Sequence, residues 1–348
     1  MTNRELAHQL NISPASLSLI LNHKPGVSSA TRERIVQQLG QLGYSNLIKP
    51  YPNPPCQNDN ICFVIYRRHG LILDQHPFFL LMTESIENHA RKHGYHILLT
   101  TVDRKNPIDE QIDNLNQMNA KGFIIFATEM LDDDIACFKK LKQPYISMDN
   151  DFTNQNINAV SINNAMGAYQ AVNYLYQMGH RHIGYLQSQV HISSFGEREH
   201  CYKDAMECLG IQLHPEYHYK VRYTEEGSYQ DFKIYLQTSP SLPTAFVADD
   251  DTMAIGVMRA LSEKGIRVPE DISIIGFNDR PACQISAPRL TTINVPRHSF
   301  GTEAVDCLLS LIERYKGSVI GRSIKIRIGT QLVQRESVKK LNVGAETD

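Results

Sequence analysis

From residue 61 onward, short apolar segments alternate with longer amphipathic ones, and this alternation constrains the fold more than any other feature. Helical stretches such as 77–94, with Phe78, Met82, Ile86 and Ala90 on one face, separate the apolar segments. Continuous apolar strands that alternate with helices indicate an α/β fold, with parallel sheets covered on both faces. The predicted strands are 61–66, 95–101, 122–128, 145–150, 182–188, 243–249 and 271–279.

Polar residues directly after these segments are candidates for a binding site, because parallel sheets bind ligands beyond the carboxyl ends of their strands. Asp149 and the run Asp249–Asp251 occupy such positions, and Asn278 lies near the end of the seventh segment. In the predicted order of strands, the nearest candidates to contact Asp249–Asp251 are uncharged hydrogen-bonding residues, and a second cluster of carboxylates is farther away. We therefore predict no metal and no cofactor at this edge of the sheet.

The first 44 residues have a different pattern, that of three short helices. Ser13 is placed to cap the second helix, with Pro14 in its first turn, and Ser28 is placed to cap the third. A tight turn at 11–13 separates the first two helices, which predicts a helix-turn-helix bundle. The predicted inward-facing residues are Leu6, Ala7, Leu10, Leu17, Ile20, Leu21, Ile35, Leu39 and Leu42.

Residues 45–59 contain four prolines in fifteen positions, so they cannot form a continuous helix and are predicted to be a linker. The first fifty residues carry five cations and two anions, a net charge of +3, whereas the remainder carries 30 cations and 35 anions, a net of −5. A basic head on an acidic body suggests that the head meets a polyanion.

Seven cysteines without CxxC spacing argue against a disulfide framework and a zinc site. No apolar run approaches the length of a membrane span, and no export signal is recognised at the N-terminus. The sequence therefore predicts a cytoplasmic protein that does not contact a membrane.

Common enzyme signatures are absent from the sequence, among them GxxxxGK[ST], GxGxxG, GxSxG and HExxH. The run Asp132–Asp134 opens a predicted helix, where acids interact favourably with the helix dipole without a metal. The run His180–His182 leads into a strand, at the end of the sheet opposite to the ligand side. We interpret it as a structural turn and predict no enzymatic activity.

Six separated motifs resemble those of the lactose/galactose-repressor (LacI/GalR) family of bacterial transcription regulators. In chain order they are VSSATRERIVQQLGQLGY, YLYQMGHRHIGYL, FGEREHCYKDAM, PTAFVADDDTMAIGVMRAL, GIRVPEDISIIGFND and PRLTTINVP. The resemblance covers nearly the whole chain. It implies an N-terminal all-α helix-turn-helix head (1–45), a Pro-rich hinge (46–59) and a two-lobed parallel-sheet core like periplasmic sugar-binding proteins (60–340).

The same resemblance divides the core into lobe 1, at about 60–160 and 295–328, and lobe 2, at about 161–293 and 329–340. It implies three crossings between the lobes, near 161–162, 294–295 and 329–330.

Carried over by motif, Arg198 resembles the family's arginine that binds hydroxyls or carboxylates of the effector, a task suited to a rigid fork of donors. Asp250 stands where the family usually has Asn, and Asn278 where it usually has Asp, so the pair retains one acid and one amide. Asp149 resembles a further polar residue of the cleft. Four aromatic residues, for which core packing is the alternative role, complete the predicted effector set: Phe78, Phe79, Phe195 and Tyr223.

The resemblance makes the second helix of the head the recognition helix, which enters the DNA major groove. The usual base-reading positions hold Pro14, Ala15 and Leu19, which offer only apolar contacts, and the linker lacks the family's N-x-x-A-R-x-L hinge. The polar members of the predicted set can instead cap their own helices. The predicted DNA-binding residues are Pro14, Ala15, Ser16, Ser18, Leu19, Asn22, Ser28, Ser29, Thr31 and Arg32.

We therefore predict a homodimeric, DNA-binding transcriptional repressor that binds double-stranded operator DNA and a small effector between its lobes. A carbohydrate is the favoured effector, with a purine or an amino sugar as alternatives, and a tetramer is the alternative to the dimer. Three other functions stay open: a regulator of this fold with weak or partner-dependent DNA binding, a solute-binding protein, and an enzyme that uses the acids 249–251 and 279.

Overall fold

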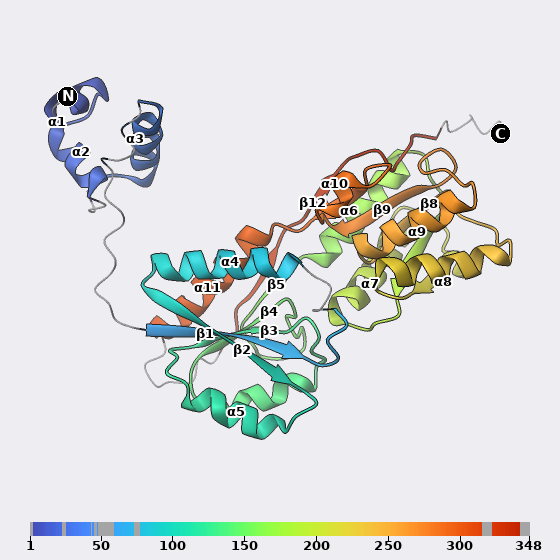
Figure 1. The fold of residues 1–348 in the computed structure, drawn as a ribbon, viewed down its shortest axis with the longest axis horizontal. Coiled ribbons are helices and arrows are strands. Elements are labelled where there is room, and N and C mark those ends of the chain that lie inside the picture. Colours follow the sequence, from blue (N-terminus) through green and yellow to red (C-terminus); the bar gives the residue numbers. More distant parts are fainter. Residues whose placement is uncertain are drawn as a thin grey trace. The chain divides into compact units, whose positions relative to one another are not determined.

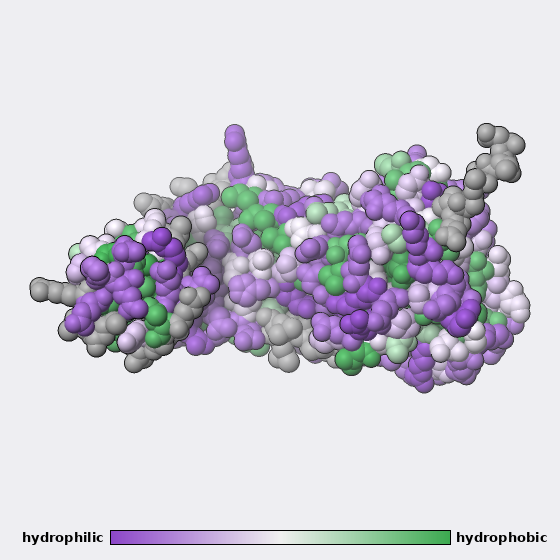
Figure 2. Space-filling model, turned by 90° about the horizontal axis from the view of Figure 1, so that it is seen from above, coloured by the Kyte–Doolittle hydropathy of each residue, from purple (hydrophilic) through white to green (hydrophobic). Residues whose placement is uncertain are grey.

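The computed structural model describes residues 3–22, 26–42, 44, 47, 59–72, 77–314 and 322–341. The chain separates into two units, residues 1–59 with 90–96 and residues 60–89 with 97–348. Most of the predicted linker, 46–59, lies outside the described residues. In the part of the chain that is described, no helix is both long and apolar enough to cross a membrane. The face drawn in Figure 2 is mostly hydrophilic, with apolar side chains in small separate patches.

Three helices form the N-terminal bundle: α1 (Asn3–Gln9), α2 (Pro14–Leu21) and α3 (Ser29–Gln41) (Figure 1). The predicted caps are confirmed, because the Ser13 hydroxyl accepts from the Ser16 N–H and the Ser28 hydroxyl accepts from the Thr31 N–H. Each cap satisfies a backbone donor that the first turn of a helix leaves unpaired. The sequence therefore determines where α2 and α3 begin.

The core of this bundle is apolar and almost completely buried. Leu42 is the one predicted core residue that is exposed, at 40%, because α3 ends before it and Leu42 forms the cap. The other predicted inward-facing residues are confirmed as buried: Leu6, Ala7, Leu10, Leu17, Ile20, Leu21, Ile35 and Leu39.

The core unit contains two six-stranded sheets, and we call each sheet with its helices a lobe. In lobe 1 the strand order is β11-β5-β4-β3-β1-β2, and Figure 1 shows α4 and α11 over one face of this sheet and α5 over the other. Its strands are β1 (Asp59–Arg67), β2 (Tyr95–Asp103), β3 (Phe123–Phe126), β4 (Tyr145–Met148), β5 (Ala159–Ile162) and β11 (Lys325–Ile328). Its helices are α4 (Pro77–Lys92), α5 (Ile108–Gln117), the 3₁₀ helix η3 (Asp134–Lys140) and α11 (Arg297–Arg314).

In lobe 2 the strand order is β12-β10-β9-β8-β6-β7. The strands are β6 (Ile183–Ser188), β7 (His218–Val221), β8 (Ala245–Ala248), β9 (Ser273–Asn278), β10 (Thr291–Asn294) and β12 (Gln331–Val333). The helices are α6 (Asn164–Gln177), α7 (Ser193–Cys208), the 3₁₀ helix η4 (Pro215–Tyr217), α8 (Glu225–Gln237), α9 (Asp251–Glu263) and α10 (Ala282–Ile285).

Both sheets are built from parallel pairs, as the apolar alternation predicts. Among the strand pairs whose direction the structure describes, one is antiparallel, that of β12 with β10. Five strands have no counterpart among the predicted ones: β5, β7, β10, β11 and β12. Each has three or four residues and includes a polar side chain, so none forms the continuous apolar run that marks β3 and β8 at the same length.

Helices cover both faces of the lobe 2 sheet. A Cβ built on Gly167 of α6 would lie 2.6 Å from the Phe277 ring, and one built on Gly276 would lie 2.1 Å from the Asp251 carboxylate of α9. Because Gly276 and Phe277 are consecutive residues of β9, their side-chain positions point to opposite faces of the sheet. Helices α6 and α9 therefore pack on opposite faces, at distances that require glycine.

The chain passes three times between the two lobes. It leaves the lobe 1 sheet after β5 and enters α6, which packs against β8, β10 and β12. It returns after β10 to α11, which packs against β3, β4 and β5, and it crosses a third time between β11 and β12. The ends of these connecting segments lie close to residues that follow the strands of both sheets.

The run 180–182 leads into β6 but is not itself a turn, because the turn before it ends at residue 179; His180 nevertheless has a structural role. This residue is fully buried, with Nδ1 2.9 Å from the Thr244 hydroxyl and Nε2 3.2 Å from the Lys339 carbonyl oxygen. Burial lowers the pKa of His180 to about 4, so its ring is neutral near pH 7.

Candidate functional site

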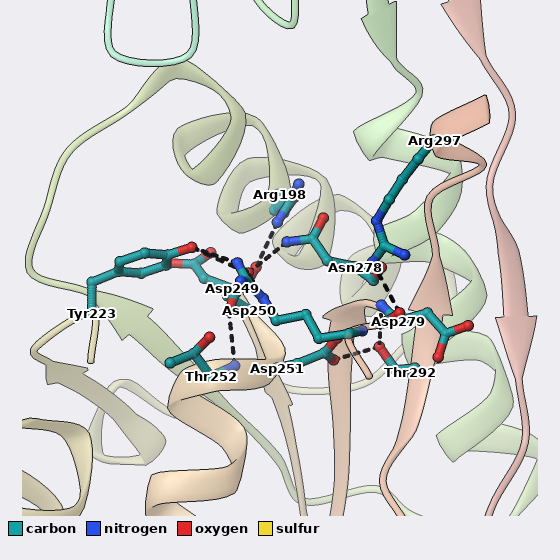
Figure 3. Close-up of polar contacts among 11 residues, drawn as sticks. Arg198, Tyr223, Asp249, Asp250, Asp251, Thr252, Asn278, Asp279, Thr292 and Arg297 are labelled. Atoms are coloured by element: carbon teal, nitrogen blue, oxygen red, sulfur yellow. Dashed lines mark hydrogen bonds and ion pairs between the residues drawn. The ribbon is translucent and has the colours of Figure 1, made fainter. Parts of the chain in front are cut away.

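A buried polar cluster lies at the carboxyl ends of β8 and β9, where ligands of such sheets bind (Figure 3). Asp250 caps α9, with its side chain accepting from the Thr252 N–H at 2.8 Å. The Asn278 side-chain amide donates to Oδ2 of Asp250 at 2.5 Å. The structure thus brings Asp250 and Asn278 into contact, the acid and the amide that occupy exchanged positions relative to the usual residues of the family.

Arg280 is a member of this cluster that the sequence analysis missed. Its guanidinium donates to Oδ2 of Asp250 at 2.7 Å and to the Tyr223 hydroxyl at 2.8 Å, and its side chain is only 9% exposed. Burial by itself would lower the pKa of Arg280, but the charge of Asp250 holds it above the ordinary value. The sequence did indicate Arg280 as a candidate site residue, because it comes shortly after the end of β9, behind Asn278 and Asp279, at the ligand side of the sheet.

Arg198 of α7 is held in place by protein groups from two directions. Its Nε donates to the side-chain oxygen of Asn164 at 2.8 Å, and NH1 donates to the backbone carbonyl of Asp249 at 2.6 Å. The guanidinium lies over the Phe277 ring, 3.7 Å from its centroid. A fork of donors fixed in this way is pre-organised for recognition and loses little freedom when a ligand binds.

The acids of this region are engaged by protein donors. Tyr185 donates to Asp249 at 2.5 Å and Thr292 donates to Asp251 at 2.5 Å, while Arg335 pairs with Asp279 at 2.5 Å. Burial raises the pKa of Asp249 to about 7, and burial together with the neighbouring Asp250 charge raises that of Asp251. Protonation near neutral pH thus reduces the repulsion among three consecutive buried acids.

Two of the predicted aromatic residues are packed inside lobe 2. Phe195 and Tyr223 are 5% and 4% exposed, and their ring centroids lie 5.4 Å apart. Burial and the nearby Asp250 charge raise the pKa of Tyr223, so its hydroxyl keeps its proton. The side chains of Phe78 and Phe79 lie outside the described residues.

Asp149 lies in lobe 1, directly after β4. Its Oδ2 accepts from the Thr128 hydroxyl at 2.6 Å, and burial raises the pKa of its carboxyl group. Both Asp149, with φ of 81°, and Asn278, with φ of 103°, have backbone conformations that L residues rarely adopt. Such conformations cost about 1–3 kcal/mol and concentrate at functional sites, which supports a binding role for these two positions.

The structure also shows what the predicted DNA-binding residues contact within the head. Pro14, Ala15 and Ser18 are exposed at the start and on the outer face of α2, and Leu19 is partly exposed. The hydroxyl of Ser16 lies 2.8 Å from that of Ser13, and the Asn22 amide donates to the Ser18 carbonyl at 2.7 Å.

Several polar residues of the predicted DNA-binding set make bonds inside the bundle. The Arg32 guanidinium donates to the carbonyl oxygens of Leu19 and Ile20, each at 3.3 Å, which ties α3 to the end of α2. The hydroxyls of Ser28 and Thr31 lie 2.8 Å apart. The Ser29 side chain lies outside the described residues.

Glu129, three residues after the end of β3, organises the loop that follows β1. Its fully buried carboxylate accepts four backbone N–H groups, those of residues 68, 69, 70 and 72, at 2.8–3.0 Å. Burial alone would raise the pKa of Glu129, but these donors hold it below the ordinary value. The sequence analysis missed Glu129, although its place after a predicted strand marked it as a candidate.

Replacing Glu129 with Ala is expected to unfold the 68–72 loop locally, because four buried or half-buried N–H groups lose their acceptor and each unsatisfied group costs about 1–3 kcal/mol. Hydrogen exchange should show loss of protection at residues 68–72 and unchanged protection in β6 and β8. Replacement of the exposed Glu110 on α5 serves as the control. Equal protection of the loop in both variants would contradict this role for Glu129.

Comparison with known proteins relates the chain to transcriptional repressors. The model of a periplasmic binding protein-like domain matches residues 172–338. The HTH-type transcriptional repressor PurR of Haemophilus influenzae (strain PittEE) is 27% identical over 344 residues, covering 98% of this chain and 99% of PurR. The HTH-type transcriptional repressor CytR of Escherichia coli (strain K12) is 29% identical over 342 residues, covering 98% and 97%.

Solved structures share the fold over nearly the same length. A complex of the transcriptional regulator CelR with cellobiose superposes with a TM-score of 0.70 at 21% identity, covering 97% of this chain and 99% of CelR. The Lac repressor dimer bound to operator and the anti-inducer ONPF gives 0.69 at 23% identity, again covering 97% and 99%. A ribose-bound LacI family regulator from Enterococcus faecium gives 0.66 at 25% identity, covering 81% and 100%. The chain is thus similar over nearly its whole length to HTH-type transcriptional repressors, and it shares the fold of the Lac repressor.

Proposed function

We propose that this protein is a DNA-binding transcriptional repressor whose affinity for operator DNA is controlled by a small effector bound between its lobes. One observation carries the proposal: α2 buries Leu17, Ile20 and Leu21 and presents Pro14 and Ala15 outward, in the same chain as a two-sheet core. The relatives that align over almost their full length carry the name of transcriptional repressors.

The surface of α2 is suited to apolar contact with DNA bases. Pro14, Ala15 and Leu19 can touch a thymine methyl group, but they cannot make the bidentate hydrogen bonds that Arg makes with guanine. Contacts to phosphate would come from backbone N–H groups at the starts of α2 and α3 and from the hydroxyls near them. We expect affinity to depend strongly on salt and sequence preference to favour A·T pairs.

Control by an effector requires that ligand binding changes the relation between the lobes. Side-chain hydrogen bonds join the lobes. Among them, Arg297 of α11 donates to the Asn278 carbonyl at 2.6 Å, Asn150 to the Ser193 hydroxyl at 2.9 Å, and Arg327 to Glu197 at 2.8 Å. An effector that contacts Asn278 and Asp149 would act on the same segments. The expected effector is a carbohydrate or a derivative, recognised by Arg198, Asp250 and Asn278.

A homodimer is the expected assembly, since the Lac repressor that shares the fold is described as a dimer on its operator. Ile285 of α10 is 85% exposed and Ile234 of α8 is 60% exposed, which is consistent with a surface that a second copy covers. Sedimentation velocity distinguishes the dimer from the monomer and from the alternative tetramer.

Replacing Ala15 with Glu is expected to weaken DNA binding about tenfold or more, because a carboxylate then faces the phosphates at the start of α2. The helix itself should remain stable, because an acid in the first turn interacts favourably with the dipole. Fluorescence titration against DNA upstream of the gene measures the change. The matched control is Gln37→Glu on the exposed part of α3, which adds the same charge away from α2.

The same titration, run over a range of salt concentrations, tests the proposal as a whole. A repressor prefers one sequence over random DNA at every salt concentration and loses affinity as salt rises. Equal affinity for the upstream DNA and for random DNA would instead favour the alternative in which the head binds DNA weakly or only with a partner.

A further inference from the structure

A cavity of about 300 Å³ opens between the lobes beside Asp149. Its walls come from Asp132 before η3, from the segment after β4, from β5 and from the first turns of α7, so both lobes contribute. Of the described residues in the predicted effector set, only Asp149 lines it. The names of the similar proteins do not say which chemical groups the residues around this cavity would bind. The residues that line the cavity indicate the class of effector.

The cavity is acidic. Four carboxylates line it, those of Asp132, Asp149, Asp151 and Glu197, and no Lys, Arg or His does. Arg327 forms ion pairs with two of them, Asp151 at 2.6 Å and Glu197 at 2.8 Å, and its single charge offsets one of the two. Asp132 and Asp149 have no ion-pair partner among the residues that the structure describes. Burial raises the pKa of Asp149 and the charge of Arg198 lowers it, so a ligand cation beside Asp149 would favour its ionised form.

A second, independent feature points to a ligand. Ser161 of β5 lines the cavity and is only 3% exposed, yet its hydroxyl oxygen has no hydrogen-bond partner. A buried hydroxyl without a partner is costly, and native proteins rarely retain one without a reason. A ligand hydroxyl in the cavity would satisfy Ser161, and Ser194 at the start of α7 offers a second hydroxyl.

The geometry favours an organic cation over a metal ion. Within the described part of the chain, no three of the lining carboxylates have ligand atoms within 4.8 Å of one another, as a metal site would need. The unpaired N–H groups at the start of α7 favour oxygen acceptors in the ligand. A molecule with one charged nitrogen and several hydroxyls satisfies both requirements.

We infer that the effector is a hydroxylated amine, such as an amino sugar, whose protonated nitrogen pairs with Asp149 and one of whose hydroxyls bonds with Ser161. This inference rests on the proposed function, because it names the class of effector for that repressor. It restricts the expected effectors from carbohydrates in general to those with a positively charged group.

Calorimetric titration of the full chain at pH 7 tests the inference with matched ligands. The probes are glucosamine, galactosamine and mannosamine, each compared with its parent hexose and with its N-acetyl derivative, which has the same ring without the charge. A charge-assisted hydrogen bond should make one amine bind about tenfold or more tightly than both neutral forms. A neutral form that binds as tightly as its amine, or a panel in which no amine binds, overturns the inference.

Two variants locate the binding. Asp149→Asn keeps the shape of the side chain and removes its charge, so the preference for the amine should fall to within about twofold. Ser161→Ala should weaken the amine and its neutral forms alike, by about threefold to tenfold. Asp133→Asn, an exposed neighbour of Asp132 that does not line this cavity, is the control and should change nothing. Retained amine preference in Asp149→Asn, with an unchanged melting temperature, contradicts the inference.

The outcome is separable from that of the proposed function, because calorimetry on the free protein does not require DNA. Amine binding without any sequence-preferring DNA binding would sink the proposed function and leave the inference standing. DNA binding that a neutral sugar controls, with no amine preference, would do the reverse.

Discussion

Replacing Arg280 with Met is expected to lower the free energy of unfolding by about 3–5 kcal/mol, the usual cost of leaving one partner of a buried ion pair unpaired. Asp250 is fully buried and 2.7 Å from Arg280, so the variant leaves its carboxylate without the cation beside it. The Tyr223 hydroxyl also loses a donor. Urea denaturation followed by circular dichroism measures the loss.

Two further variants make this test specific. Arg267→Met removes the same side chain from an exposed pair with Asp271, where solvent screening should leave the free energy of unfolding almost unchanged. Combining Arg280→Met with Asp250→Asn removes both charges and keeps a residue that can cap α9, so most of the stability should return. If Arg280→Met costs no more than Arg267→Met, Asp250 is not a charged partner of Arg280 in the folded protein.

Replacing Ile20 with Ala is expected to unfold the head and to weaken DNA binding about tenfold or more. Ile20 is fully buried in the bundle, and truncation of such a residue costs about 2–5 kcal/mol. A core this small supplies only about 3–5 kcal/mol in total. The apparent affinity falls with the fraction of heads that remain folded, which a DNA titration and hydrogen exchange of α1–α3 report together.

Val36→Ala is the matched control for Ile20→Ala. It also shortens a branched apolar side chain in the head, but Val36 is 36% exposed on α3, and Ala favours the helix. Exchange in the two sheets should be unchanged in both variants. Intact helices in Ile20→Ala together with lost DNA binding would mean that Ile20 acts on DNA directly and not through the core of the bundle.

Much of the candidate site was visible in the sequence because of one rule, that ligands lie beyond the carboxyl ends of parallel strands. The rule led to Asp149 and the run Asp249–Asp251, and the family resemblance singled out Asp250 and Asn278, which the structure places in direct contact. It applied equally to Glu129 and Arg280, which the sequence analysis left out. The roles of Glu129 and Arg280 depend on which groups their side chains contact, and their positions in the sequence do not show these contacts.

Other members of the network were hidden because their strands lack a continuous apolar run. Ser161 is itself the polar residue that interrupts β5 (AVSI), and Asn164 follows that strand. Arg327 belongs to β11, at the far end of the chain, and reaches Asp151 and Glu197 across more than a hundred residues. Such long-range pairs have no local signature.

The sequence by itself determined the alternation of strands and helices, the helix caps at Ser13 and Ser28, and the apolar core of the head. These follow from local rules, since capping and side-chain periodicity act over three or four residues. Only the tertiary structure decided which charges are paired, which hydroxyl is left without a partner, and where negative charge remains. Pairing is decided by distances between segments far apart in the chain, and burial gives each pair its energetic weight.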